Sequence, residues 1–171
     1  MKRVVVPVII ILAVALIAAG CSTETTPTGT KPISGGTLVY ASGVAEPTCL
    51  GPHVGGNYPQ ALVATEYLES LVSKNTAGEF IPWLVTKWTE SPDGLSWDST
   101  LRKDVKFTDG TALTPHAIAA NIAPVQDPAT GSSTGYLALQ KVTAVTTVSA
   151  DVARFTLSRP DSALLDSLSQ P

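Results

Sequence analysis

Two cysteines and two histidines are the side chains best suited to covalent, acid–base or metal chemistry: Cys21, Cys49, His53 and His116. The sequence contains neither a Cys-x-x-Cys nor a His-x-x-x-His spacing, either of which would predict a metal site. The members of a Ser–His–Asp site need not be neighbours in the sequence. However, His53 stands in a loop rich in proline and glycine, and His116 in the first turn of a short expected helix. Both places are typical of surface histidines, so we expect no catalytic residue, no metal site and no cofactor.

Cys21 follows a segment with the order of a secretory signal. Residues 1–3 carry positive charge, an apolar run follows over 4–19, and Gly20 precedes the cysteine. This order is typical of a lipobox, in which a signal peptidase cuts before the cysteine and the cysteine carries the lipid. We therefore expect a lipoprotein signal peptide at 1–20, lipidation of Cys21, and anchoring at the extracytoplasmic (periplasmic or cell-wall) face of a bacterial cytoplasmic membrane.

Other interpretations of these residues stay open. The apolar run is slightly shorter than the roughly 20 residues of a spanning helix, but an uncleaved anchor or an ordinary secretory signal would look similar. If Cys21 carries lipid, Cys49 is a single thiol, which we expect to be a small buried hydrophobe. The rival is a Cys21–Cys49 disulfide in an oxidising compartment.

Charge and length limit the remaining possibilities. Without residues 1–20 the chain keeps 9 of its 11 basic residues against 14 acidic ones, a net charge of −5. Nucleic-acid binding needs a basic face, and adhesion to anionic lipid needs a polybasic segment, so both are disfavoured. Residues 21–34, rich in Thr and Pro, predict a flexible tether behind the lipidated cysteine. Residues 35–171 are the expected folded part.

The folded part is predicted to alternate short strands and helices. A β-rich apolar stretch predicts a buried strand at 37–41, and apolar spacings of three and four predict a helix over 59–74. Pro92-Asp93-Gly94 predicts a turn that joins residues 87–89 to a strand at 96–101. The other expected elements are a strand at 105–107 ended by a turn at 108–111, a helix over 115–122 capped by Thr114, a loop at 126–135, a hairpin of 142–148 with 152–157, and a helix over 163–168.

Two segments carry a family pattern. Residues 81–94 read Ile-Pro-Trp-Leu-Val-Thr-Lys-Trp-Thr-Glu-Ser-Pro-Asp-Gly, and residues 101–111 read Leu-Arg-Lys-Asp-Val-Lys-Phe-Thr-Asp-Gly-Thr. They resemble the family 5 extracellular solute-binding proteins, which serve ABC importers of oligopeptides, dipeptides and nickel. Further matching stretches lie at 35–40, 66–72 and 153–160, so the resemblance covers nearly all of 35–171 in the right order.

The resemblance implies an α/β fold of the periplasmic-binding-protein-like (type II) class. Family members are much longer and close two lobes on the ligand like a hinge. Residues 35–171 are therefore expected to be the N-terminal part of lobe one, an incomplete lobe with a mixed sheet, hairpins and short helices. Within it, Phe107 and the tryptophans are expected to supply core, and Arg102 to pair with a carboxylate or with carbonyls.

The resemblance also implies a ligand-binding loop. In the family, the loop between the first strand and the first long helix faces the cleft and contacts extended peptides through backbone groups. By position that loop is Gly55, Gly56, Asn57 and Tyr58, whose glycines allow a close approach of the ligand. The alternative is an ordinary helix-entry loop with Tyr58 in the core.

The sequence thus predicts a binding protein and not an enzyme. The expected function is that of an extracytoplasmic substrate-binding lipoprotein of an ABC importer. Its expected partners are an oligopeptide or dipeptide ligand, the permease subunits, and the membrane through the lipid anchor. Nickel, haem or opine-like ligands stay open, and so does a small structural or adhesive surface lipoprotein without a transport role.

Overall fold

The computed structural model describes residues 34–37, 39, 41, 43, 49–54 and 58–170, and the chain divides into two units between Ala41 and Ser42. In the first unit, Thr37, Val39 and Ala41 belong to no strand, and Val39 is 88% exposed. The prediction of a buried strand is therefore wrong at these described positions. No described residue pairs with them, and an unpaired strand leaves its backbone groups and apolar side chains in water.

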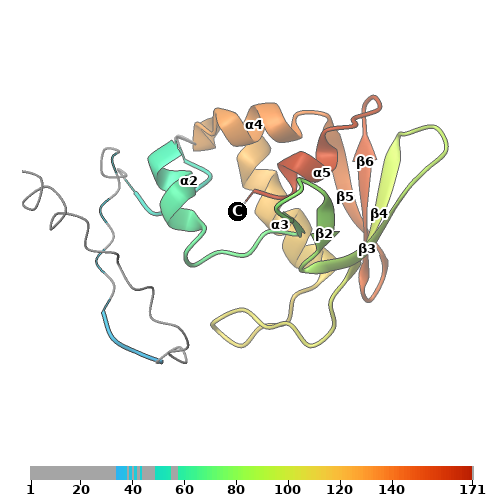
Figure 1. Ribbon diagram of the computed structural model, residues 1–171. Helices are drawn as coiled ribbons and strands as arrows, with labels where there is room; N and C mark the ends of the chain where they lie inside the picture. Colours follow the sequence, from blue (N-terminus) through green and yellow to red (C-terminus); the bar gives the residue numbers. More distant parts are fainter. Residues whose placement is uncertain are drawn as a thin grey trace, which may run out of the picture. The chain divides into compact units, whose positions relative to one another are not determined.

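The second unit, Ser42–Pro171, holds all the regular elements of the described residues (Figure 1). None of the described helices is long and apolar enough to cross a membrane. In chain order the elements are α2 (Tyr58–Ala64), β1 (Val72–Lys74), β2 (Phe80–Pro82), β3 (Val85–Glu90), β4 (Ser96–Leu101), α3 (Pro115–Gln126), the 3₁₀ helix η1 (Pro128–Thr130), α4 (Thr134–Leu139), β5 (Val142–Ser149), β6 (Val152–Leu157) and α5 (Leu164–Ser167).

A four-stranded antiparallel sheet forms the centre of this unit, with strand order β3-β4-β6-β5, and β1 pairs with β2 in a separate hairpin. The predicted hairpin of β5 with β6 and the predicted pairing of β3 with β4 are both confirmed. Strands β4 and β6 bury every second residue, so that Trp97 and Phe155 face each other on the inner side. The outer side carries mainly hydroxyl and charged groups, as is usual for an antiparallel sheet with one solvated face.

Helices α3 and α5 pack against the inner side of the sheet and complete the core. Ile118 and Ile122 come from α3 and Leu164 from α5, and both Leu164 and Phe155 are fully buried. The predicted cap is confirmed, because Ala117 N donates to Thr114 Oγ1 at 3.2 Å. The helix continues to Gln126 instead of ending near 122, since Val125 extends its buried stripe.

The predicted helix over 59–74 is wrong in its second half. Helix α2 ends at Ala64, and Val72–Lys74 is strand β1. The apolar spacing is real, but Val72 pairs with Pro82 across the hairpin and its amide binds Leu168. Tertiary pairing of this kind overrides a local helical preference.

Two further predictions fail around α3. Residues 105–107 form no strand, because Lys106 makes a single isolated bridge with Ala112 and Asp104 before it has a positive φ of 63°. The turn that follows is confirmed, with Gly110 N donating to Phe107 O at 2.9 Å. The predicted loop at 126–135 instead contains η1 and the start of α4, which has no buried residue and therefore no apolar stripe to reveal it.

The turn between β3 and β4 depends on glycine. Gly94 has a φ of 69°, its amide donates to Ser91 O at 2.9 Å, and it is buried against Pro160. A Cβ at this position would lie 3.0 Å from Pro160 Cβ. A side chain there meets two costs, the left-handed backbone and a contact with a rigid ring.

We expect Gly94→Ala to lower the free energy of unfolding by about 2–4 kcal/mol, combining backbone strain with overpacking. Gly110→Ala is the matched control, because Gly110 has a φ of 86° with nothing within 4 Å of its Cβ position. The control should lose only about 1–2 kcal/mol. Urea unfolding of both variants measures the difference, and equal losses would show that Pro160 does not restrict the turn.

The outer side of the sheet carries a two-bond ion pair. Arg154 donates to both carboxylate oxygens of Asp98, Nε and one Nη each at 2.6 Å, between the neighbouring strands β4 and β6. These hydrogen bonds lower the pKa of Asp98 from its usual 3.8. Because the folded pKa is lower than the unfolded one, the stabilisation is complete above pH 3.8 and is lost as the pH falls through the lowered pKa.

We expect Asp98→Asn to flatten the acid limb of the stability curve. Above pH 5 the variant should be slightly less stable than the wild type, and the difference should vanish as the pH falls through the lowered pKa of Asp98, where the carboxyl becomes protonated in the folded state as well. Thermal unfolding followed by circular dichroism across this range measures it. A difference that persists unchanged at the lowest pH would contradict an electrostatic role for the pair.

Candidate functional site

Three segments that are distant in the sequence meet at Leu71. The amides of Leu71 and Val72 both donate to Leu168 O, at 3.1 and 3.3 Å, and Val85 N donates to Leu71 O at 2.7 Å. Leu168 is buried directly after α5. These bonds fix the start of β1, the start of β3 and the end of α5 in one place, and we call this group of bonds the Leu71 junction.

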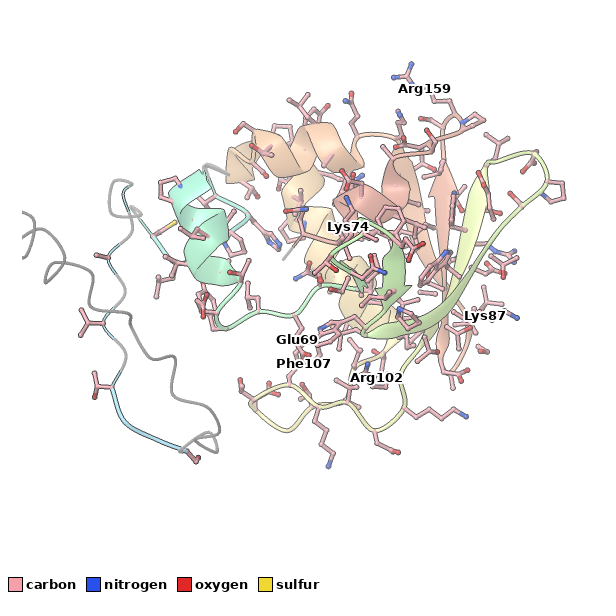
Figure 2. All side chains as sticks on the ribbon, viewed as in Figure 1. Glu69, Lys74, Lys87, Arg102, Phe107 and Arg159 are labelled. Atoms are coloured by element: carbon pink, nitrogen blue, oxygen red, sulfur yellow. The ribbon has the colours of Figure 1, made fainter. Side chains whose placement is uncertain are left out.

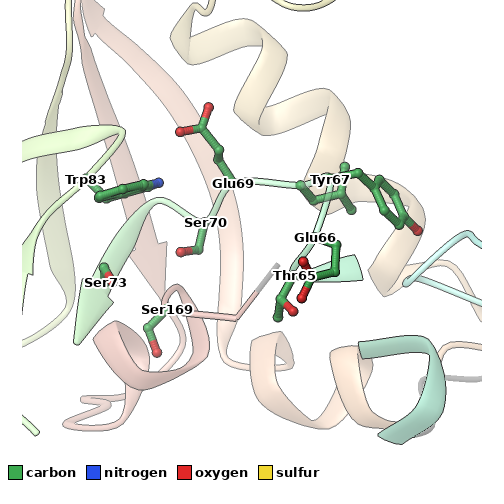
Figure 3. Close-up of a pocket in the computed structure, with 9 residues that line it drawn as sticks. Thr65, Glu66, Tyr67, Glu69, Ser70, Ser73, Trp83 and Ser169 are labelled. Carbon is green, nitrogen blue, oxygen red and sulfur yellow. The ribbon is translucent and has the colours of Figure 1, made fainter. Parts of the chain in front are cut away.

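A hollow of about 460 Å³ opens beside the Leu71 junction (Figure 3). Its size lies in the range of sites for small ligands. One wall is the segment that follows α2, a second comes from β1 and the residue after β2, and a third follows α5. The lining residues are Thr65, Glu66, Tyr67, Leu68, Glu69, Ser70, Ser73, Trp83 and Ser169.

An ion pair braces the β1 wall against α5. Lys74 Nζ pairs with Asp166 of α5, and the same ammonium lies over the Phe80 ring, 5.0 Å from its centroid. Phe80 in turn packs against the core. The brace therefore adds a side-chain link to the backbone bonds of the Leu71 junction. Lys74, labelled in Figure 2, is not among the residues that line the hollow.

Aromatic residues expected in the core lie at the surface of the described part. Trp83 is 40% and Phe107 48% exposed, whereas Trp97 is buried. The expectation that Phe107 and all the tryptophans supply core is therefore wrong, because Trp83 follows the short hairpin and Phe107 sits in an open turn. Arg102 forms no ion pair with a carboxylate of the described residues; its guanidinium lies over the Trp83 ring, 5.8 Å from the centroid.

A second polar cluster lies before and within α2. Gln60 is 2% exposed and its Nε2 donates to Cys49 Sγ at 2.8 Å. Cys49 is half-buried and accepts a hydrogen bond, so it is not the fully buried hydrophobe that the sequence predicts. His53 is also half-buried, and loss of solvent lowers its pKa from 6.5, while His116 is exposed. Among the described residues, no group of three or more His, Cys, Asp or Glu could hold a metal ion.

The predicted site residues fall largely outside the described part of the chain. Gly55, Gly56 and Asn57 lie outside it, and so does Cys21. Tyr58 is the first residue of α2. The binding role of this loop therefore stays a prediction, but α2 connects it directly to the segment at 65–70 that lines the hollow.

The hollow itself was not predicted from the sequence. Its lining comes from four separate stretches of chain, and only the fold brings them together. The one available signal was Trp83, an aromatic residue in the family pattern whose exposure the sequence does not reveal.

The chain contains one sequence motif that is typical of nucleophilic serines, but the local fold that such a serine needs is not present at this motif. Gly131-Ser132-Ser133-Thr134-Gly135 has the Gly-x-Ser-x-Gly spacing. A nucleophile elbow needs a strained turn from a strand into a helix. Here η1 precedes the motif, and Ser133 has ordinary helical angles of φ −89° and ψ −57°. The spacing is therefore no evidence for an acyl-transfer site.

The known proteins that this chain resembles are periplasmic binding proteins. The chain is 34% identical to the periplasmic oligopeptide-binding protein OppA of Haemophilus influenzae over 88 residues, which is 52% of this chain and 16% of that protein. It is 40% identical to the nickel-binding periplasmic protein of Escherichia coli over 79 residues, 46% of this chain and 15% of that protein. The relatives are binding proteins and not enzymes.

Solved structures agree with the fold. The structure of the Escherichia coli murein tripeptide binding protein MppA superposes with a TM-score of 0.66 at 27% identity, covering 72% of this chain and 27% of that one. The predicted α/β, periplasmic-binding-protein-like fold is thereby confirmed. The chain spans only about a sixth of the two curated relatives and about a quarter of the solved protein.

A family description matches more than half of the chain directly. Residues 79–171 match the bacterial extracellular solute-binding proteins, family 5 Middle. This match begins at the β1–β2 hairpin and includes the sheet, α3 and α5. The chain therefore belongs to the family 5 bacterial extracellular solute-binding proteins.

Proposed function

We propose that this chain is part of the extracytoplasmic substrate-binding lipoprotein of an ABC importer, and that it captures peptides for transport. The observation that carries the proposal is the family match over 79–171. It is supported by the adjacent hollow of about 460 Å³, which no described side chain fills. Family membership also favours this function over that of a small structural lipoprotein.

The choice of peptides rests on the relatives and on the lining. Two of the three relatives are named for binding oligopeptides or a murein tripeptide, and one for binding nickel. The hollow combines an exposed indole, an aromatic phenol ring and several hydroxyls. Ligand sites of this kind pair apolar contact area with a few polar groups that fix orientation.

The proposed organisation keeps the three predicted segments. Residues 1–20 act as the signal peptide, residues 21–34 as the tether behind lipidated Cys21, and residues 35–171 as the N-terminal part of lobe one. In a protein with the full length of the relatives, a second lobe would close on the ligand, and the closed form would present the ligand to the permease subunits. The described residues contribute one wall of such a site.

The peptide proposal is tested by measuring retention of a mixture of tripeptides on the full chain, followed by calorimetry with the peptide retained best. Tyr58→Ala should weaken binding about tenfold with the unfolding temperature unchanged, because an aromatic contact of an interface typically contributes this much. Tyr136→Ala, an exposed tyrosine of α4, is the control and should bind normally. Unchanged affinity in Tyr58→Ala would remove the loop from the site, and no retained peptide would overturn the proposed function.

Lipidation is tested separately. A bacterial host expressing the full chain is fed a radiolabelled fatty acid, and the purified protein is assayed for label and for partition into detergent. Cys21→Ser should abolish both, since the lipid is attached at this residue. Cys49→Ser is the matched control and should keep both. A wild-type protein without label would show that the signal is of another kind.

A further inference from the structure

The hollow beside the Leu71 junction is poor in hydrogen-bond donors. The amides of Thr65, Glu66, Tyr67 and Leu68 all donate to carbonyls of α2, at 2.8–3.2 Å. Trp83 N donates to Val85 O at 3.0 Å. Most main-chain donors along two of its walls are therefore already used within the chain.

Four of the five hydroxyl groups of the lining are used in the same way, and among the described residues only that of Ser73 makes no such bond. Thr65 Oγ1 donates to Leu62 O, Ser70 Oγ to Val72 O and Ser169 Oγ to Asp166 O, each at 2.7 Å. A hydroxyl has one proton, so each of these oxygens can only accept a further bond. Gln170 Nε2 donates to Ser169 Oγ at 3.5 Å, which still leaves it a lone pair. The Tyr67 hydroxyl is likewise committed, to Leu50 O.

Two carboxylates add negative charge to this acceptor-rich lining. Glu66 and Glu69 are exposed, and within the described residues neither side-chain carboxylate takes part in a hydrogen bond or ion pair. No lysine or arginine lines the hollow. Two basic residues close to lining positions are engaged: Lys74 pairs with Asp166, and the Arg102 guanidinium lies over the Trp83 ring.

The neighbouring surface has the opposite character. A second hollow, of about 420 Å³, is lined by three basic residues, Arg102, Lys103 and Lys106, together with Asp104 and Asp151. Lys103 Nζ lies 3.7 Å from Asp151 Oδ2. The absence of cations from the lining of the first hollow is therefore a local property and not a general shortage of basic residues on this side of the chain.

An aromatic surface completes the first hollow. Trp83 is the only described lining residue with an indole, and Figure 3 shows its nitrogen turned toward the segment of Glu69 and Ser70. Indole rings attract cations through their faces, and carboxylates accept short, charge-assisted hydrogen bonds from ammonium and guanidinium groups. The indole N–H is a donor that this lining keeps. The acceptors, the negative charge and the indole ring nevertheless fit a cationic group that brings its own donors.

We propose that the hollow formed by Thr65–Ser70, Ser73, Trp83 and Ser169 binds the cationic group of a peptide, an ammonium or a guanidinium, through Glu66 and Glu69. The proposal rests on the proposed function and specifies the substrate class of the same site. Two sources share this chemistry, the N-terminal ammonium and a lysine or arginine side chain. The hollow would select the ligand by its charge, and the predicted loop of residues 55–58 would contact the ligand backbone.

The test uses calorimetry on the full chain with four matched peptides. These are Ala-Arg-Ala, Ala-citrulline-Ala, and the N-acetyl form of each, so that the side-chain charge and the terminal charge are removed separately. Citrulline keeps the shape of arginine, and the acetyl group is a small neutral cap. We expect loss of one of the two charges to weaken binding about tenfold, equivalent to about 1.4 kcal/mol. The charge whose removal matters identifies the source of the cation.

The variants then assign the effect to the hollow. The double change Glu66→Gln and Glu69→Gln should abolish the preference, so that charged and neutral peptides bind alike. Glu90→Gln at the far end of β3 is the control with the same chemistry, and it should keep the preference. Preference for the cation in the wild type should also fall with added salt, because exposed charges are screened.

The outcomes separate the two proposals. Equal binding of all four peptides, or an unchanged preference in the double variant, would overturn the cation site while leaving peptide binding intact. If no peptide binds, the proposed function fails, and titration with agmatine decides the cation site alone. Saturable NMR shifts of the Trp83 indole that vanish in the double variant would support it, and no saturable shift would overturn it.

Discussion

The Leu71 junction is the constraint on which the described site depends. One carbonyl, that of Leu168, accepts two consecutive amides of the β1 wall, and the carbonyl of Leu71 accepts the first amide of β3. Buried backbone groups must be paired, and here the pairing partners come from segments almost 100 residues apart in the chain. Without α5 in place, the start of β1 would have unsatisfied donors and the hollow would lose its third wall.

The buried side of α5 explains why this junction can be rigid. Leu164, Leu165 and Leu168 belong to the same core as Phe155 and Val142, so the helix is held by apolar contacts with the sheet. Burial of large apolar side chains is the main favourable term in such packing. The apolar core therefore fixes the positions of the walls of the adjacent polar hollow. The exposed glutamates of the hollow are not needed to hold these walls in place.

Sequence patterns predicted the elements whose partners are close in the chain. The β3–β4 and β5–β6 hairpins followed from turn residues and alternation, and Thr114-Pro115 marked the start of α3. The patterns failed where distant pairing decides the outcome. Val72 has helical spacing relative to Leu68, yet it pairs with Pro82 and binds Leu168.

The site was less predictable than the fold for the same reason. The family pattern identified the scaffold through residues such as Trp83 and Arg102, but their contact with each other, and the exposure of the indole, depend on where the hairpin ends. Glu66 and Glu69 looked like the solvated side of a helix. They line a hollow because α2 stops at Ala64, and a turn at 65–67 followed by an irregular segment leads from there to β1.

Amide hydrogen exchange in the native state tests the central role of the Leu71 junction most directly. The amides of Leu71, Val72 and Val85 should exchange as slowly as those of the central strands, and Leu164→Ala should accelerate all three together, because α5 holds their acceptors in place. The amide of Gly78 in the β1–β2 turn provides the fast reference. Exchange of the three amides at the rate of Gly78 in the wild type would contradict the account, and so would independent responses to the substitution.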